Sequence, residues 1–328
     1  MKKYIRWVVI AVAIPIVLFL ILVVLLYCPP VQNWAIKRVA SYASQKMGMN
    51  ITVDRVRLVF PLDLGVEGVR VLQANDSIAG QTDTIANVGR IVANVQLMPL
   101  LSNKVEVDEL SLHDVQMNTA NLVHEARIKG KVGLLLVQSR GVDLNSKTIR
   151  VNQAQLKDAN ISVELSDTVP PDTTKTPIYW KIKVDKLQIE HSKALLRTPR
   201  DSMTVLVDLP KLDAKNGYFD LYKNLYRLET LDWQNGSLNY DQTYKPRTDG
   251  LDPNHIHLTE LNLGIDSFYF CQPELKMNLR VCAFKEKSGV RVNHLSGHVG
   301  LDSTRIALPN LELRTPESSL TAKFNMDM

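Results

Sequence analysis

The chain has 328 residues, and its 39 Lys and Arg against 34 Asp and Glu give a formal net charge of +5. This excess lies in residues 1–50, which hold six basic and no acidic residues, so residues 51–328 carry 33 basic against 34 acidic side chains. A balanced surface without clustered positive charge excludes nucleic acid from the partners that we expect. Three cysteines in a chain of this length do not form a disulfide framework.

Residues 8–26 form an uninterrupted apolar run of nineteen residues. At about 1.5 Å per helical residue, such a run matches the roughly 30 Å hydrocarbon core of a bilayer. A cleaved signal peptide is the alternative, but this run is longer than a signal core, and no small-residue cleavage site follows it. We therefore predict a single transmembrane anchor over residues 8–27.

The orientation of this anchor follows from its flanks. Basic residues precede the apolar run in residues 1–7, and short basic ends stay on the cytoplasmic side of a membrane. The bulk of the chain is then expected on the outer side of that membrane.

Residues 31–48 carry apolar side chains at helical spacing, with Gly48 as a plausible C-terminal stop. Basic and aromatic side chains on this amphipathic helix suit a position on lipid headgroups. Alternatively, its apolar face packs against the first strands as a cap, which is the common fate of such helices and the interpretation that we prefer. The candidate membrane-interface residues are Lys2, Lys3, Arg6, Trp34, Lys37 and Arg38.

From Ile51 onward the apolar period changes to two, and turn-forming residues such as Asn216-Gly217 and Asn235-Gly236 recur. This pattern predicts a mainly β region over residues 51–328, built from many antiparallel strands joined by hairpins. Residues 167–177 have no apolar spacing and are expected to form an exposed loop.

A repeat appears when apolar residues are aligned at offsets 0, 2, 7 and 9. We interpret each copy as a strand, a short turn and a returning strand that share one apolar face. The alternative is an ordinary β-sandwich, which produces the same alternation. Four full copies start at residues 154, 187, 231 and 261, and imperfect copies start at residues 110 and 311.

Catalytic and metal-binding motifs are missing from the sequence. The pairs His255/His257 and His294/His298 lack the further ligands that a metal site needs. We expect no enzyme activity, no metal and no cofactor. Cys271 and Cys282 lie eleven residues apart, and free thiols are preferred over a disulfide between them.

The order of segments resembles a known family. A helix precedes the strand pattern Ile51, Val53, Val56, and the run 99–101 (Pro-Leu-Leu) precedes a second strand pattern at Val105, Val107, Leu110 and Leu112. This arrangement resembles the AsmA-like superfamily, most closely the N-terminal part of the TamB translocation and assembly module proteins. The motif-bearing part covers about residues 1–120, and the looser repeat continues to the end.

This resemblance implies a protein anchored in the inner membrane of a Gram-negative bacterium, with its bulk in the periplasm. It implies a long, curled antiparallel β-sheet that forms an elongated apolar groove. Family members take part in phospholipid movement to the outer membrane and in outer-membrane protein biogenesis with a barrel partner. The family's C-terminal domain is not found in this sequence, so docking to a barrel cannot be carried over, and we expect a longer full-length protein.

Two functions follow as hypotheses. In the first, membrane phospholipids bind an apolar groove and move toward the outer membrane. The alternative is a scaffold or chaperone that guides outer-membrane proteins by pairing with exposed strand edges. The inward-facing groove candidates, taken from the repeat, are Leu156, Ile189, Leu231, Trp233, Leu261 and Leu263.

Overall fold

The computed structural model describes residues 29–59, 63–74, 82–96, 107–119, 126–143, 146–165, 179–200 and 202–327. The predicted anchor over residues 8–27, the basic residues Lys2, Lys3 and Arg6, and the loop 167–177 lie outside these residues. Within the described ranges, no helix has the length and apolar character needed to cross a membrane.

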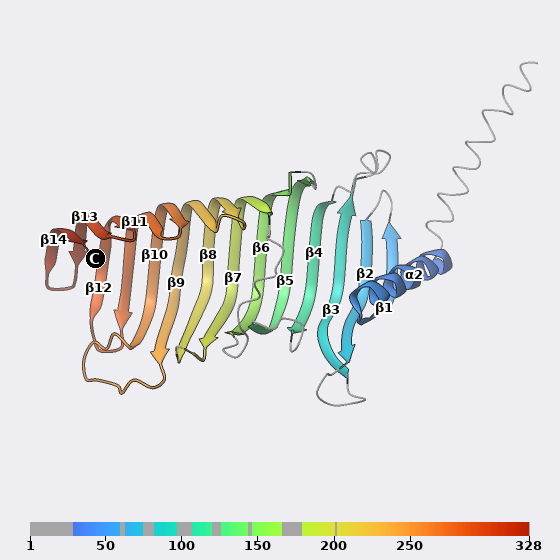
Figure 1. Cartoon of the computed structure of the whole chain (residues 1–328), viewed down its shortest axis with the longest axis horizontal. Helices are drawn as coiled ribbons and strands as arrows, with labels where there is room; N and C mark the ends of the chain where they lie inside the picture. Colours follow the sequence, from blue (N-terminus) through green and yellow to red (C-terminus); the bar gives the residue numbers. More distant parts are fainter. Residues whose placement is uncertain are drawn as a thin grey trace, which may run out of the picture.

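One helix and fourteen strands make up the described residues, and the strands stand side by side in chain order (Figure 1). The helix is α2 (Pro29–Met47), close to the predicted range of 31–48. The strands are β1 (Asn50–Val59), β2 (Asp63–Ala74), β3 (Thr82–Val95), β4 (Val107–Asn118), β5 (Ala126–Asp143), β6 (Thr148–Leu165), β7 (Lys181–Thr198), β8 (Met203–Asp220), β9 (Leu225–Gln242), β10 (His255–Cys271), β11 (Glu274–Glu286), β12 (Arg291–Leu301), β13 (Arg305–Arg314) and β14 (Ser319–Asp327).

The described strands form a single sheet, so the expectation of a mainly β chain with one long sheet is confirmed, and a two-sheet sandwich is not formed by them. This sheet is uncurled, which differs from the curled sheet that the resemblance implies. A sheet closes only when its edge strands approach each other, and here β1 and β14 lie at opposite ends (Figure 1).

The pairing is antiparallel between all neighbours except β6 and β7, which run parallel. The expectation of a purely antiparallel sheet is therefore wrong at this junction. The reason lies in the connection, because parallel neighbours need a crossover of a dozen or more residues. Residues 166–180 separate β6 from β7, whereas four residues separate β8 from β9.

The four full repeat copies are not strand, turn and strand, which corrects the interpretation above. Each copy lies within one long strand, and a residue with positive φ interrupts its alternation. Before this residue the apolar side chains stand at even-numbered positions and after it at odd-numbered positions, or the reverse. Because the left-handed residue interrupts the alternation, the apolar side chains on both sides of it lie on one face of the sheet. In β6, Leu156 and Ile161 accordingly pack on the same cluster. The interrupting residues are Asp158, His191, Asn235 and Ser267.

Only the last imperfect copy is a strand, a turn and a returning strand. Leu311 and Leu313 lie in β13, Leu320 lies in β14, and Leu313 is the cross-strand partner of Leu320. A turn and a left-handed residue within a strand thus produced the same apolar spacing.

The core is spread along the sheet. Val115, Val132 and Ala159 from β4, β5 and β6 form a buried cluster, against which apolar side chains of β3 to β6 pack. At the start of the sheet, α2 packs beside β1, and the Ile51 backbone N–H donates to Ser44 Oγ at 3.0 Å. The helix therefore covers the β1 end of the sheet (Figure 1).

Candidate functional site: an apolar row across fourteen strands

One apolar residue from each strand lines up with its neighbours across the whole sheet. Each member is the cross-strand partner of the next, so the fourteen side chains share one face. We call this set the apolar row. Its members are Val56, Val66, Ile91, Leu112, Leu135, Leu156, Ile189, Leu212, Trp233, Leu263, Cys282, Leu295, Leu313 and Leu320.

Four of the six predicted groove residues belong to the apolar row: Leu156, Ile189, Trp233 and Leu263. The other two lie on the same face in parallel rows. Leu231 is the partner of Ala214 and Ile265, and Leu261 is the partner of Gly236 and only 3% exposed. The sequence thus placed all six candidates on one face.

Leu212 is a row residue that the sequence prediction missed. Its strand, β8, carries the same spacing of 0, 2, 7 and 9 at Val205, Val207, Leu212 and Ala214. Pro210 lies within this copy of the repeat. Because proline is uncommon within a strand, it made the copy look unlike a strand in the sequence. The spacing alone was a sufficient signal.

Rows beside the apolar row widen the apolar surface. One consists mainly of valines from β1 to β5 and leads to Ala159 in β6. A second row, of aromatic rings, lies near the other ends of the strands. The centroid of the Tyr226 ring is 6.2 Å from that of Phe219 and 6.1 Å from that of Phe270. The valine row comprises Val53, Val69, Val88, Val115, Val132 and Ala159.

The opposite face is charged. Lys157 and Glu190, each next in sequence to a row residue, form an ion pair of 2.9 Å. The hydrogen bond from Lys157 lowers the pKa of the Glu190 carboxyl from its ordinary value. Arg280 binds Asp266 at 2.9 Å and also contacts Asp232 on the same face. The sheet is therefore amphipathic over its whole length.

Trp233 is the largest side chain in the apolar row and is only 7% exposed. Its indole N–H donates to the backbone oxygen of Asp208 at 3.2 Å. The ring lies over Gly236, where an added Cβ would come within 2.0 Å of the indole nitrogen. The glycine therefore creates the space that the tryptophan occupies.

Ser192 and Glu286 are buried polar side chains on the apolar face, and both are hydrogen-bonded. Ser192 Oγ donates to the Glu190 backbone oxygen at 2.8 Å and accepts from the Ala159 N–H. Burial raises the pKa of Glu286, but hydrogen bonds led by Ser288 outweigh this effect, and the pKa is lowered. Both side chains therefore have hydrogen-bond partners within the sheet.

The side chains proposed for a membrane interface on α2 face solvent. Trp34 is 63% and Tyr42 66% exposed, and Lys37 and Arg38 are also exposed. The Arg38 guanidinium lies 6.0 Å from the centroid of the Trp34 ring. Packing beside β1 thus leaves an aromatic and basic surface on the helix.

The histidines and cysteines that the structure describes do not form a metal site. Within the described ranges no cluster of three or more His, Cys, Asp or Glu residues could hold a metal ion. His255 Nδ1 lies 2.9 Å from Asp252 Oδ2, and His298 contacts Asn310. Cys271 and Cys282 are both free and half-buried.

Comparisons with known proteins give no further identification. No family model matches the chain, and no similar sequence is found among curated proteins.

Proposed function

We propose that this protein holds phospholipid acyl chains on its apolar face and takes part in phospholipid transport from the inner to the outer membrane of a bacterial envelope. The observation that carries this proposal is the apolar row, which continues without a polar member through fourteen strands. A continuous apolar path is what a chain of methylene groups needs in order to move.

An amphipathic sheet must cover its apolar face with something. Among the described residues, the strands make a single layer, and the only helix lies at the β1 end. Lipid tails fit the remaining requirement, because burial contributes about 0.8 kcal/mol per methylene without polar specificity. Such binding is also reversible, as transport requires.

Bent strands support a groove on this face. Asp114 and Asp158 adopt positive φ within their strands, and their Cβ atoms lie 3.0 Å from where a Cβ on Gly89 and Gly133 would stand. Left-handed residues that align across neighbouring strands bend those strands at the same level. Trp233 is only 7% exposed although no second layer of described strands covers it, which agrees with a concave apolar face.

The proposed entry point is the β1 end of the sheet. There α2 presents Trp34, Lys37 and Arg38 to solvent, and aromatic and basic side chains are typical of membrane interfaces. With the predicted anchor over residues 8–27 in the inner membrane, this end of the apolar row would lie next to the lipids.

The proposal is tested by placing a charge on either face. Leu212→Lys puts an ammonium group into the apolar row, and Gln234→Lys puts one on the opposite face. Phospholipid that copurifies with the full chain is counted by mass spectrometry, with circular dichroism to confirm folding. We expect Leu212→Lys to carry less than half of the wild-type lipid and Gln234→Lys to carry the wild-type amount. Equal lipid in all three proteins would contradict the proposal.

A second candidate function is favoured by one observation. The edge strand β14 exposes large apolar side chains, with Leu320 52%, Phe324 43% and Met326 42% exposed. Exposed strand edges pair with strands of other chains, as a scaffold for outer-membrane proteins would require. Crosslinking from β14 to barrel proteins, with wild-type lipid content in Leu212→Lys, would favour this function.

A further inference from the structure

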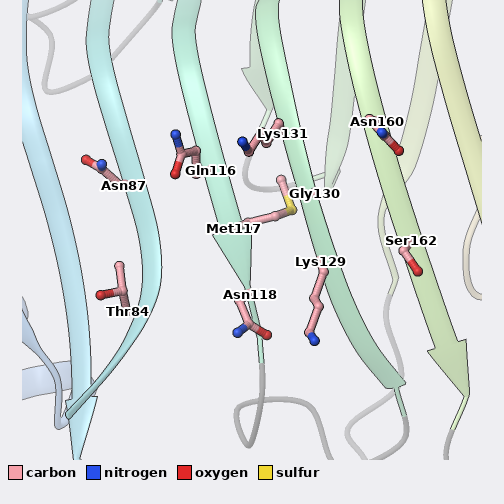
Figure 2. Close-up of a pocket in the computed structure, with 10 residues that line it drawn as sticks. All are labelled: Thr84, Asn87, Gln116, Met117, Asn118, Lys129, Gly130, Lys131, Asn160 and Ser162. Carbon is pink, nitrogen blue, oxygen red and sulfur yellow. The ribbon is translucent and has the colours of Figure 1, made fainter.

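A pocket lies on the charged face, away from the apolar row. It has a volume of about 640 Å³ and is formed by β3, β4, β5 and β6 (Figure 2). Its ten lining residues include two lysines, four side-chain amides and two hydroxyl groups, but no carboxylate. They are Thr84, Asn87, Gln116, Met117, Asn118, Lys129, Gly130, Lys131, Asn160 and Ser162.

The strand register explains why these groups meet. One cross-strand row joins Asn87, Gln116, Lys131 and Asn160, and a second, two residues further along, contains Lys129. Side chains two residues apart on a strand point to the same face, so both lysines of β5 point to the charged face.

Gly130 stands between these lysines and lines the pocket with its backbone. Figure 2 shows it next to Met117, with the polar side chains around them. An added Cβ at Gly130 would lie 2.8 Å from the Asn160 backbone oxygen, so the strands approach closely there.

Among the described residues, the two lysines of the pocket have no acidic partner, unlike other lysines on nearby strands. On the adjacent strands, Lys157 is paired with Glu190 at 2.9 Å and Lys193 with Asp208 at 3.7 Å. Lys129 and Lys131 form no ion pair with any residue in the described ranges. Two neighbouring cations without a counter-charge create a positive potential that favours an anion.

The amides supply the matching hydrogen bonds. In the described part of the chain, the side chains of Asn87, Gln116 and Asn160 make no hydrogen bonds. Each amide NH₂ group offers two donors, and an oxyanion offers several acceptors. We propose that this pocket binds a phosphate-type oxyanion, with Lys129 and Lys131 neutralising its charge and the amides orienting it.

The test uses the full chain in a phosphate-free, non-ionic detergent and ³¹P NMR titration. The probes are inorganic phosphate, glycerol 3-phosphate and dihexanoyl phosphatidylglycerol below its micelle concentration. Lys129→Gln with Lys131→Gln removes both charges, and the control is Lys183→Gln with Lys215→Gln, two exposed lysines elsewhere on the sheet. We expect the first pair to weaken binding about tenfold or more and the control to match wild type.

The probes separate the two sources of phosphate. Preference for the short-chain lipid identifies a headgroup, and preference for inorganic phosphate identifies a free anion. Either result supports the site, and rising salt should weaken binding in both cases. Binding that is equal in both variants, or that no probe shows, would overturn the proposal. Since none of the substituted residues belongs to the apolar row, this result is independent of the lipid experiment above.

Discussion

Single residues with left-handed backbone bend the strands of this sheet. Asp114, Asp158, Asn216 and Asn235 all have φ near +50° within long strands. Asp and Asn tolerate this region better than other non-glycine residues, because their short side chains bond locally. These residues keep the apolar positions on one face when the alternation changes its phase.

Substitution of Asn235 tests this role. Asn235→Gly should leave the free energy of unfolding within a few tenths of a kcal/mol, because glycine adopts positive φ readily. Asn235→Val should destabilise by about 1–2 kcal/mol, since a β-branched residue is strained there. Urea unfolding measures both, with Gln234→Val as a control at an ordinary strand position. A valine at 235 that costs nothing would show that no strain is present.

We expect Asp252 to make the connection between β9 and β10 sensitive to acid. Its carboxylate accepts from the N–H groups of Thr248 and Asn254 and contacts His255, each at 2.9 Å. Led by the Thr248 hydrogen bond, these contacts lower its pKa from 3.8 to about 2. A lowered pKa stabilises the fold above the unfolded value, and this stabilisation is lost as pH falls through the folded value.

Asp252→Asn should therefore be less stable than wild type at pH 5–7, and the difference should shrink between about pH 4 and pH 2. Urea unfolding at several pH values measures this difference, and Asp249→Asn in the same connection is the control. A difference that does not change with pH would mean that the charge of Asp252 is not what holds the connection.

At the scale of elements, the parallel junction between β6 and β7 has a polar ladder of its own. Gln153 Nε2 donates to Gln188 Oε1 at 3.1 Å, and Gln188 Nε2 donates to Asp213 Oδ1 at 3.0 Å. The ladder spans β6, β7 and β8 on the charged face. It helps to fix the register where a hairpin cannot.

Replacing the central amide tests the ladder. Gln188→Met removes both hydrogen bonds and should destabilise the protein by about 1–2 kcal/mol. Lys183→Met, on the same strand and face, should change stability by less than about 0.5 kcal/mol. Thermal and urea unfolding give both values. Equal effects of the two substitutions would show that the ladder does not stabilise the protein.

The sequence was sufficient to predict strands and the face of the six groove candidates, because a period of two survives in every segment. It was not sufficient to separate a bend from a turn. Asp158 and Asn235 are residues that favour both, and only pairing with neighbouring strands decides between them. The same holds for residues 167–177, whose composition predicts a loop but not that β6 and β7 run parallel. The pocket that contains Lys129 and Lys131 had no sequence signal, because exposed polar side chains follow no period.

At the scale of the whole molecule, the described strands form an amphipathic sheet whose two faces carry different chemistry. The apolar row runs from Val56 near α2 to Leu320 in β14, while ion pairs and the Lys129/Lys131 pocket lie on the other face. Because an apolar path and a charged surface are separated by one backbone layer, lipid contact should be confined to one face.

Site-specific photocrosslinking in cells tests this central claim most directly. A photoreactive amino acid is placed at Leu135, Leu212 or Leu295 in the apolar row, or at the opposite-face neighbours Lys211 and Gln234. We predict phospholipid adducts from all three row positions, which lie in β5, β8 and β12, and none from Lys211 or Gln234. Adducts only from the charged face, or none from the row, would contradict the account.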